Sequence, residues 1–179
     1  MNQKTTRKYE LIAKIATQDT DVMPELTELC GIDFQTAFEM WEFALGRGKD
    51  VVLQGFDLFN STSELKTRQL FCESGPLQKL VYSSPHATNP KLLNFLVQLI
   101  MISKIDTADE CLQKLRTNNH IDFNDFLRVI IDSTFAASCQ KNNTRVPSFN
   151  KKQKDLMKDY INKIKGPNKA LLLQRMKEL

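Results

Sequence analysis

The sequence predicts an all-α fold, and three observations support this class. Apolar side chains recur at helical spacing through most of the 179 residues. Glycine and proline are scarce, with six of each, which disfavours a loop-rich all-β fold. Candidate N-cap residues precede several of the apolar segments. A chain of this length can bury a sizeable core in one domain, or in one domain with an appendage.

The predicted helices follow one another with short polar breaks. In chain order they cover residues 4–17, 23–30, 34–45, 51–60, 64–73, 77–81, 92–102, 108–115, 122–137, 148–165 and 168–179. Asp33, Ser63 and Asp106 are expected N-caps, because their side-chain oxygens accept hydrogen bonds from the first turn of a helix. Gly31 is expected to end the second helix, in the position that favours glycine.

Residues 50–53 admit two interpretations. Asp50 is expected to cap a helix that starts at Val51. The apolar run Val51-Val52-Leu53 could instead form a short strand.

Residues 75–103 are expected to form the centre of the core. A short apolar helix leads through a polar loop into a longer helix over 92–102. The longer helix is apolar on nearly every side and is interrupted only by Asn94 and Gln98. Such a helix must be buried against neighbours on several faces.

The net charge of +4 is unevenly distributed. Residues 141–179 contain eleven Lys or Arg against three acidic residues, a balance of +8, so residues 1–140 carry −4. Residues 138–149 are polar and contain a proline, which is typical of a linker. We therefore expect a core domain over 1–140 and a basic helical hairpin over 141–179 that packs as a C-terminal cap or appendage.

An internal period suggests a helical repeat. When Gly31 is laid over Gly75, 44 residues later, the apolar segments that follow them also align. The region 20–137 resembles armadillo and HEAT repeats, whose units run to roughly 40–47 residues. An irregular helical bundle is the alternative architecture.

This resemblance implies a groove lined by the third helix of each unit, where armadillo repeats carry a Trp followed four residues later by an Asn. Phe56 and Asn60 occupy these positions in the first unit, whereas Val97 and Met101 depart from the pattern in the second. The resulting groove candidates are Phe56, Asn60, Asn94 and Gln98. The alternative for each one is an ordinary position within a helix.

No arrangement of residues in the sequence predicts catalysis or a cofactor. The four cysteines form no CxxC motif, and the two histidines have no third metal ligand in register. Carboxylate pairs such as Glu39 and Glu42 recur at helical spacing, as on a solvated helix face. The N-terminus has no apolar signal segment and no apolar run could span a bilayer, so we expect an intracellular protein, cytoplasmic or nuclear, with buried reduced thiols.

These observations favour a non-enzymatic adaptor that binds another protein. The alternative is a nucleic-acid-binding or regulatory protein that uses the helix-turn-helix-like segment 23–45 or the basic C-terminal helices. The segment 23–45 presents Glu39 and Glu42, which oppose phosphate. The densest basic cluster consists of Lys151, Lys152, Lys154 and Lys158. The apolar C-terminal helix leaves homo-oligomerisation open.

Overall fold

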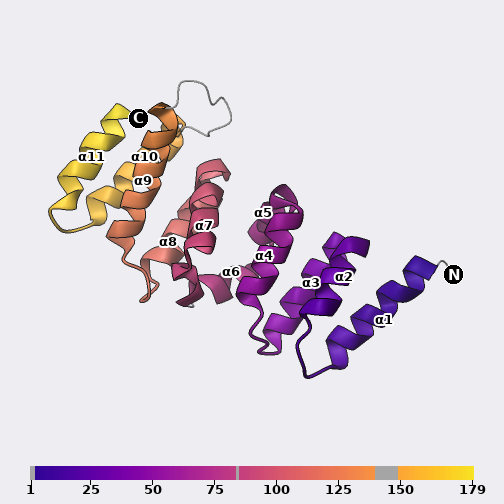
Figure 1. Cartoon of the computed structure of the whole chain (residues 1–179). Helices are drawn as coiled ribbons and strands as arrows, with labels where there is room; N and C mark the ends of the chain where they lie inside the picture. Colours follow the sequence, from indigo (N-terminus) through magenta and orange to yellow (C-terminus); the bar gives the residue numbers. More distant parts are fainter. Residues whose placement is uncertain (1–2, 84, 140–148) are drawn as a thin grey trace. The chain divides into compact units, whose positions relative to one another are not determined.

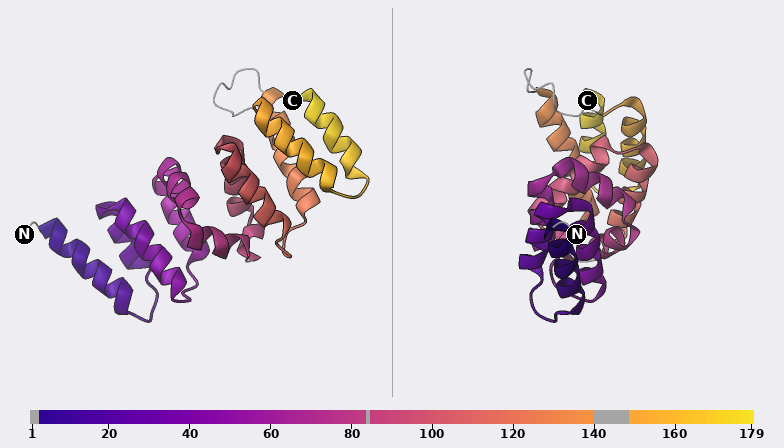
Figure 2. Two further views of the ribbon diagram at one scale, coloured as in Figure 1. Left: turned by 180° about the vertical axis from the view of Figure 1, so that it is seen from behind. Right: turned by 90° about the vertical axis from the view of Figure 1, so that its right-hand side faces the viewer.

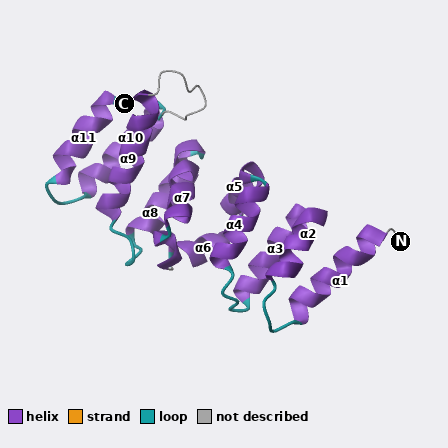
Figure 3. Ribbon diagram, viewed as in Figure 1, coloured by secondary structure: helices purple, strands orange, loops and turns teal. Residues whose placement is uncertain are grey.

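A computed structural model describes residues 3–83, 85–139 and 149–179. These residues form helices joined by short connections (Figures 1 and 2), and no strand occurs among them (Figure 3). The helices are α1 (Gln3–Thr17), α2 (Met23–Ile32), α3 (Phe34–Gly46), α4 (Val52–Thr62), α5 (Glu64–Glu73), α6 (Gly75–Tyr82), the 3₁₀ helix η1 (Pro85–Thr88), α7 (Pro90–Ile102), α8 (Ile105–Arg116), α9 (Phe123–Cys139), α10 (Lys151–Lys163) and α11 (Asn168–Glu178). The predicted all-α class is confirmed.

The chain divides into two compact units, a first unit over Met1–Val81 and a second over Tyr82–Leu179. The boundary predicted at 140/141, and most of the predicted linker around it, lie within 140–148, outside the described residues. The two basic helices α10 and α11 lie side by side (Figures 1 and 2) and pack on α8 and α9, so they belong to the second unit.

Helices of the first unit pack in the order of the chain. Helix α1 contacts α2 and α3, α2 contacts α3 and α4, α3 contacts α4, and α4 contacts α5. Each helix therefore has its main neighbours one or two places along the sequence. Local packing of this kind lets each helix bury its apolar face against the next pair.

A single residue joins α2 to α3. Asp33 has an extended backbone (φ −153°, ψ 101°), and its carboxylate accepts a hydrogen bond from the Thr36 N–H at 3.1 Å, which confirms the predicted N-cap. The prediction that the preceding helix ends at Gly31 is wrong, because α2 continues to Ile32 and Asp33 serves as its C-cap. Gly31 does not take the positive φ that favours glycine after a helix.

Ser63 joins α4 to α5 in the same way, with φ −158° and ψ 99° and a hydrogen bond from the Lys66 N–H to its hydroxyl. The predicted cap at Ser63 is confirmed. Asp33 and Ser63 thus hold equivalent positions. Gly31 and Gly75 do not, because Gly31 lies in the last turn of α2 and Gly75 is the first residue of α6.

Two other predicted helix starts are wrong. Helix α4 begins at Val52 after Val51, without a side-chain cap from Asp50, and the strand alternative for this run is also wrong. Val51 and Val52 are buried, and the Val51 carbonyl accepts the indole N–H of Trp41 at 2.8 Å. Helix α8 begins at Ile105, so Asp106 lies inside its first turn and is not its cap. Tertiary packing of Val51 and Val52 sets the start of α4.

The core of the first unit is built around Trp41. Its ring lies 5.4 Å from that of Phe38 and 5.1 Å from that of Phe59, centroid to centroid. Phe59 also meets Phe34 edge-on at 5.4 Å. Gly55 lets the α4 backbone approach the indole, because a Cβ atom there would lie 2.1 Å from Trp41 Nε1.

Helix α7 is buried on several faces, as the sequence predicted for its longest apolar segment. The prediction that residues 75–103 together form the centre of one core is wrong, because the boundary between the two units falls within them, after Val81. Leu92, Phe95, Leu96 and Val97 are buried together with Leu99, Ile100 and Met101. Helix α10 closes over the end of α7, where the Gln153 amide donates a hydrogen bond to the Met101 carbonyl at 2.6 Å. Among the described residues, no helix is both long and apolar enough to cross a membrane.

Candidate functional site

The four predicted groove residues fall in different environments and in different units. Phe56 is only 4% exposed and contributes to the core of the first unit. Asn60, one turn later on α4, is half-buried, and its Oδ1 atom is buried without a hydrogen-bond partner among the described residues. Asn94 is exposed and Gln98 half-buried on α7 of the second unit. No single described unit brings the two pairs together.

A cleft in the first unit opens between the first turn of α3 and the length of α5. We call it the α3–α5 cleft; its volume is about 260 Å³ and its lining residues are Phe34, Gln35, Lys66, Gln69, Leu70 and Glu73. The apolar part is made by Phe34, which rests edge-on against Phe59 of α4, and by Leu70. The cleft therefore has an apolar floor supported by the aromatic core.

The charged groups of this cleft have no carboxylate or cationic partner within the described residues. Lys66 Nζ lies 5.6 Å from the centre of the Phe34 ring and forms no ion pair, and Glu73 also forms none. The Gln69 amide makes no hydrogen bond to another described residue. Lys66 and Glu73 are seven residues apart on α5, which places them roughly 10 Å apart along the helix axis. The cleft presents one charge of each sign beside its apolar floor.

Leu65 extends the apolar surface next to the cleft. Its side chain is 76% exposed, and it lies one turn before Gln69 on the outer face of α5. Two other large apolar side chains are exposed in the first unit, Tyr9 on α1 (60%) and Phe43 on α3 (45%). Sequence reasoning missed the cleft, although the buried pair Thr67 and Phe71 directs Leu65 outward by helical periodicity alone.

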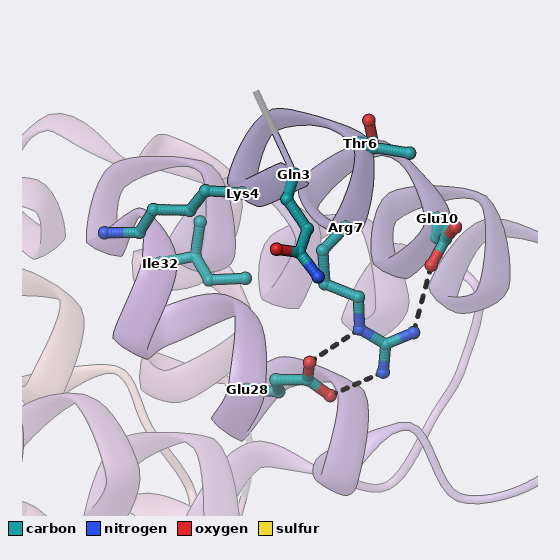
Figure 4. Close-up of a pocket in the computed structure, with 7 residues that line it drawn as sticks. All are labelled: Gln3, Lys4, Thr6, Arg7, Glu10, Glu28 and Ile32. Atoms are coloured by element: carbon teal, nitrogen blue, oxygen red, sulfur yellow. Dashed lines mark hydrogen bonds and ion pairs between the residues drawn. The ribbon is translucent and has the colours of Figure 1, made fainter. Parts of the chain in front are cut away.

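A second depression lies between α1 and α2 (Figure 4). It encloses about 690 Å³ and is lined by Gln3, Lys4, Thr6, Arg7, Glu10, Glu28 and Ile32. The Arg7 guanidinium donates to both carboxylate oxygens of Glu28 at 2.6 and 2.7 Å, and to Glu10 at 3.1 Å. These bonds raise the pKa of Arg7 and lower that of Glu28. The charges of Arg7, Glu10 and Glu28 are thus paired with one another and link α1 to α2.

The four predicted basic residues of α10 divide into two groups. Lys151, Lys154 and Lys158 follow helical spacing along one edge, which we call the lysine edge. Lys152 lies about 100° around the axis from Lys151, beyond Asp155. Lys151 and Lys152 are exposed, Lys154 and Lys158 half-buried, and none of the four forms an ion pair within the described residues.

The charge asymmetry follows the two units. The first unit contains nine Lys or Arg and twelve Asp or Glu, a balance of −3, and the second contains sixteen and nine, a balance of +7. Within the second unit, Asp159 is engaged by Lys163, and Asp132 by Arg128 and Arg175. Asp159 and Asp132 thus have partners other than the lysine edge.

Helices α2 and α3 do not present a basic surface. Glu39 is exposed and accepts a hydrogen bond from the Gln35 amide at 2.9 Å, and Glu42 accepts one from the Ser74 hydroxyl. Helix α3 contains no Lys or Arg. A carboxylate-lined helix opposes the approach of phosphate.

The polar groups most altered by their surroundings are structural. The Tyr160 hydroxyl donates to Asp109 Oδ1 at 2.6 Å, and burial, together with this bond, raises the pKa of Tyr160. Cys30 and Cys111 are buried as predicted, whereas Cys72 is exposed. In the part of the chain that the structure describes, no group of three or more potential metal ligands occurs. Comparison of the chain with protein-family models, with curated proteins and with solved structures found no match.

Proposed function

We propose that this chain is a non-enzymatic protein-interaction module of stacked helices, and that the α3–α5 cleft is its docking site. One observation carries the proposal: Lys66 and Glu73 form no ion pair with any described residue and lie beside an apolar floor, with Leu65 exposed next to them. Unpaired charges around an exposed apolar surface are the usual composition of a protein-binding patch, with an apolar centre and a polar rim.

The packing of the first unit supports a helical-repeat architecture. Helices α2 and α3 meet at Asp33 as α4 and α5 meet at Ser63, with nearly the same backbone angles and with a side-chain cap to the residue three positions on. Sequential neighbours account for its main helix contacts. Helical repeats use such stacked pairs to present a continuous surface to a partner.

The test is a comparison of partner capture by the full chain and by variants with altered surfaces. In the cleft variant, Leu65→Glu is combined with Gln69→Arg; both side chains are exposed, so we expect the fold to be retained. We expect this variant to capture about tenfold less of each partner than the wild-type chain does, because the substitutions place charges on the apolar contact. The matched control is Gln54→Arg, an exposed glutamine on α4 of the same unit.

Capture is measured by quantitative mass spectrometry after circular dichroism has shown that the variants are folded. An unchanged set of partners with the cleft variant would contradict the proposal.

A second candidate function is the binding of nucleic acid by the lysine edge. The observation that favours it is the absence of ion pairs at Lys151, Lys154 and Lys158 within the described residues of a unit that carries +7. Three phosphate contacts should give a salt dependence whose logarithmic slope falls by about 2 to 3 when all three lysines are changed to Glu. Anisotropy titrations of labelled duplex DNA and RNA across a salt series measure this slope.

The control for this titration changes the net charge equally at dispersed exposed lysines, Lys14, Lys104 and Lys165. If both triple variants lose the same affinity, only the total charge matters and the lysine edge is not a site. If the wild-type chain does not bind DNA or RNA at low salt, the nucleic-acid function is contradicted.

A further inference from the structure

We infer that the occupant of the α3–α5 cleft is an amphipathic helix of a protein partner, with one large apolar anchor and charges of opposite sign about two turns apart. This inference rests on the proposed function and specifies the chemistry of the partner. It follows from what the cleft offers to a polypeptide backbone, from its size, and from the order of its charges.

The cleft has almost nothing to offer the backbone of an extended peptide. The helices α3 and α5 offer no continuous row of free N–H and C=O groups, and no strand edge occurs in the described part of this unit. Two side-chain amides line the cleft. That of Gln35 already donates to Glu39, so only that of Gln69 is available to a peptide backbone among the described residues. An extended peptide would bury N–H and C=O groups without partners, at a cost in free energy. A helix satisfies its own backbone before it docks.

The volume of the cleft suits one or two side chains. At about 260 Å³ it lies below the size of sites that enclose small-molecule ligands, which run from about 300 to 1,000 Å³. A Leu, Met or Phe side chain from a helix could rest on Phe34 and Leu70. Leu65 lies on the next row of α5, so the same helix would cover it with a residue one turn away from the anchor.

The charges define the rim of the occupant. Lys66 is complementary to an acidic residue at one end of the contact, and Glu73 is complementary to a basic residue at the other. The two positions are separated by two helical turns. A docked helix that carries an acid and a base two turns apart, with the anchor between them, matches both ends at once. The cleft is therefore selective for the order of charges along the partner.

The experiment uses two synthetic helical peptides of about 18 residues, a length at which alanine-rich sequences form helix in water. Both have a central Leu; in the first, Lys precedes Glu by two turns, and in the second the order is reversed. Binding to the full-length wild-type chain and to the charge-swapped variant Lys66→Glu/Glu73→Lys is measured by fluorescence anisotropy. We expect the wild type to prefer one peptide by about threefold to tenfold, as expected for two exposed charge pairs.

The charge swap should invert this preference, whichever direction the peptide takes along α5. The matched control swaps an ion pair on α8, Glu110→Lys/Lys114→Glu, which has the same net charge and should leave the preference unchanged. Replacing the central Leu with Ala should lower the binding affinity of both peptides about tenfold or more. A preference that survives the cleft swap, or peptides that bind no better with Leu than with Ala, would overturn the inference.

Other occupants give different results. Equal binding by a peptide in which a central proline breaks the helix would identify an extended occupant, and self-association of the wild type that is lost in the swapped variant, measured by sedimentation, would identify a second copy of the chain. Either result overturns the inference of a helical partner but leaves the cleft as a docking site. Failure of the proposed function itself is seen separately, as partner capture that does not depend on Leu65 and Gln69.

Discussion

Gly55 allows two helices of the first unit to approach each other more closely than any other residue would. Its missing side chain leaves the place taken by the Trp41 indole, whose N–H is fixed on the Val51 carbonyl. We predict that Gly55→Ala lowers the free energy of unfolding by about 2–3 kcal/mol, because the methyl group must push α4 away from the indole and strain its hydrogen bond. Urea unfolding monitored by Trp41 fluorescence measures this loss.

The control for this prediction is the same substitution at Gly31. This glycine lies in the last turn of α2, and a Cβ atom there would contact nothing within 4 Å. Gly31→Ala should stabilise the protein by about 0.5–1 kcal/mol, because alanine loses less backbone entropy in a helix. Equal effects at the two positions would contradict the close packing of Gly55.

Asp33 makes the stability of the first unit depend on pH. The Lys8 ammonium lies 2.6 Å from its carboxylate, and this bond, with the hydrogen bond from the Thr36 N–H, lowers the pKa of Asp33 to about 2. The unfolded value is about 3.9, so the stabilisation is complete above about pH 5 and is lost as the pH falls towards 2.

We predict that Asp33→Asn is less stable than the wild type at pH 7 and that this difference disappears near pH 2. Asparagine is an equally good N-cap, so the variant removes the charge and keeps the cap. Thermal unfolding of both proteins from pH 7 to pH 2 measures the difference. A difference that stays constant over this range would show that the Lys8–Asp33 ion pair contributes nothing.

At the scale of the helix, Gln153 joins the end of α7 to the start of α10. Its amide N–H donates to the Met101 carbonyl at the end of α7, and its carbonyl accepts the Asn150 N–H in a capping box at the start of α10. The side chain is buried. We predict that Gln153→Leu lowers the free energy of unfolding by about 2 kcal/mol, because it leaves the Met101 carbonyl buried without a hydrogen-bond donor.

Chemical denaturation followed by circular dichroism tests this prediction. Gln174→Leu is the matched control, because Gln174 is exposed on α11 of the same unit and its substitution should change stability by less than about 0.5 kcal/mol. Similar losses for the two variants would show that the bond to Met101 has no net effect.

Helix ends show which parts of the fold the sequence could predict. Asp33 and Ser63 act through atoms three residues away, so their local sequence was sufficient. Gly31 and Asp50 were assigned by the same local rules and failed. At Asp50 the reason is the contact between Trp41 and Val51, which the local sequence does not show and which fixes where α4 begins. The α3–α5 cleft was missed for a related reason, since residues from two helices must meet to form it.

At the scale of the whole molecule, the sequence did not indicate where the two units divide. Helix α6 runs from Gly75 to Tyr82 across the boundary, so the helical pattern continues where a break would be needed to recognise it. The buried character of α7, in contrast, is visible in its composition alone. The basic character of the C-terminal helices was also visible, and the structure adds that Lys152 lies apart from the lysine edge of α10.

Each unit has a core of its own, so we predict that a destabilising substitution in one unit increases local unfolding in that unit and not in the other. Gly55→Ala should increase amide hydrogen exchange in α2–α4 and leave α7–α9 unchanged, while Gln153→Leu should do the reverse. Hydrogen–deuterium exchange resolved by peptide measures both responses. Increased exchange throughout the chain in either variant would show that the two cores unfold as one.

The one-residue joints at Asp33 and Ser63 limit how this chain can change in length. Adding one residue to such a joint would either lengthen a helix, and rotate the next helix by about 100°, or insert a flexible step where the cap now fixes direction. The connections over 18–22 and 47–51 are several residues long and can absorb an insertion without changing the phase of either helix. Among relatives of this chain, we therefore expect gains and losses of residues to fall between α1 and α2 and between α3 and α4, and α2–α3 and α4–α5 to be inherited as pairs of fixed length.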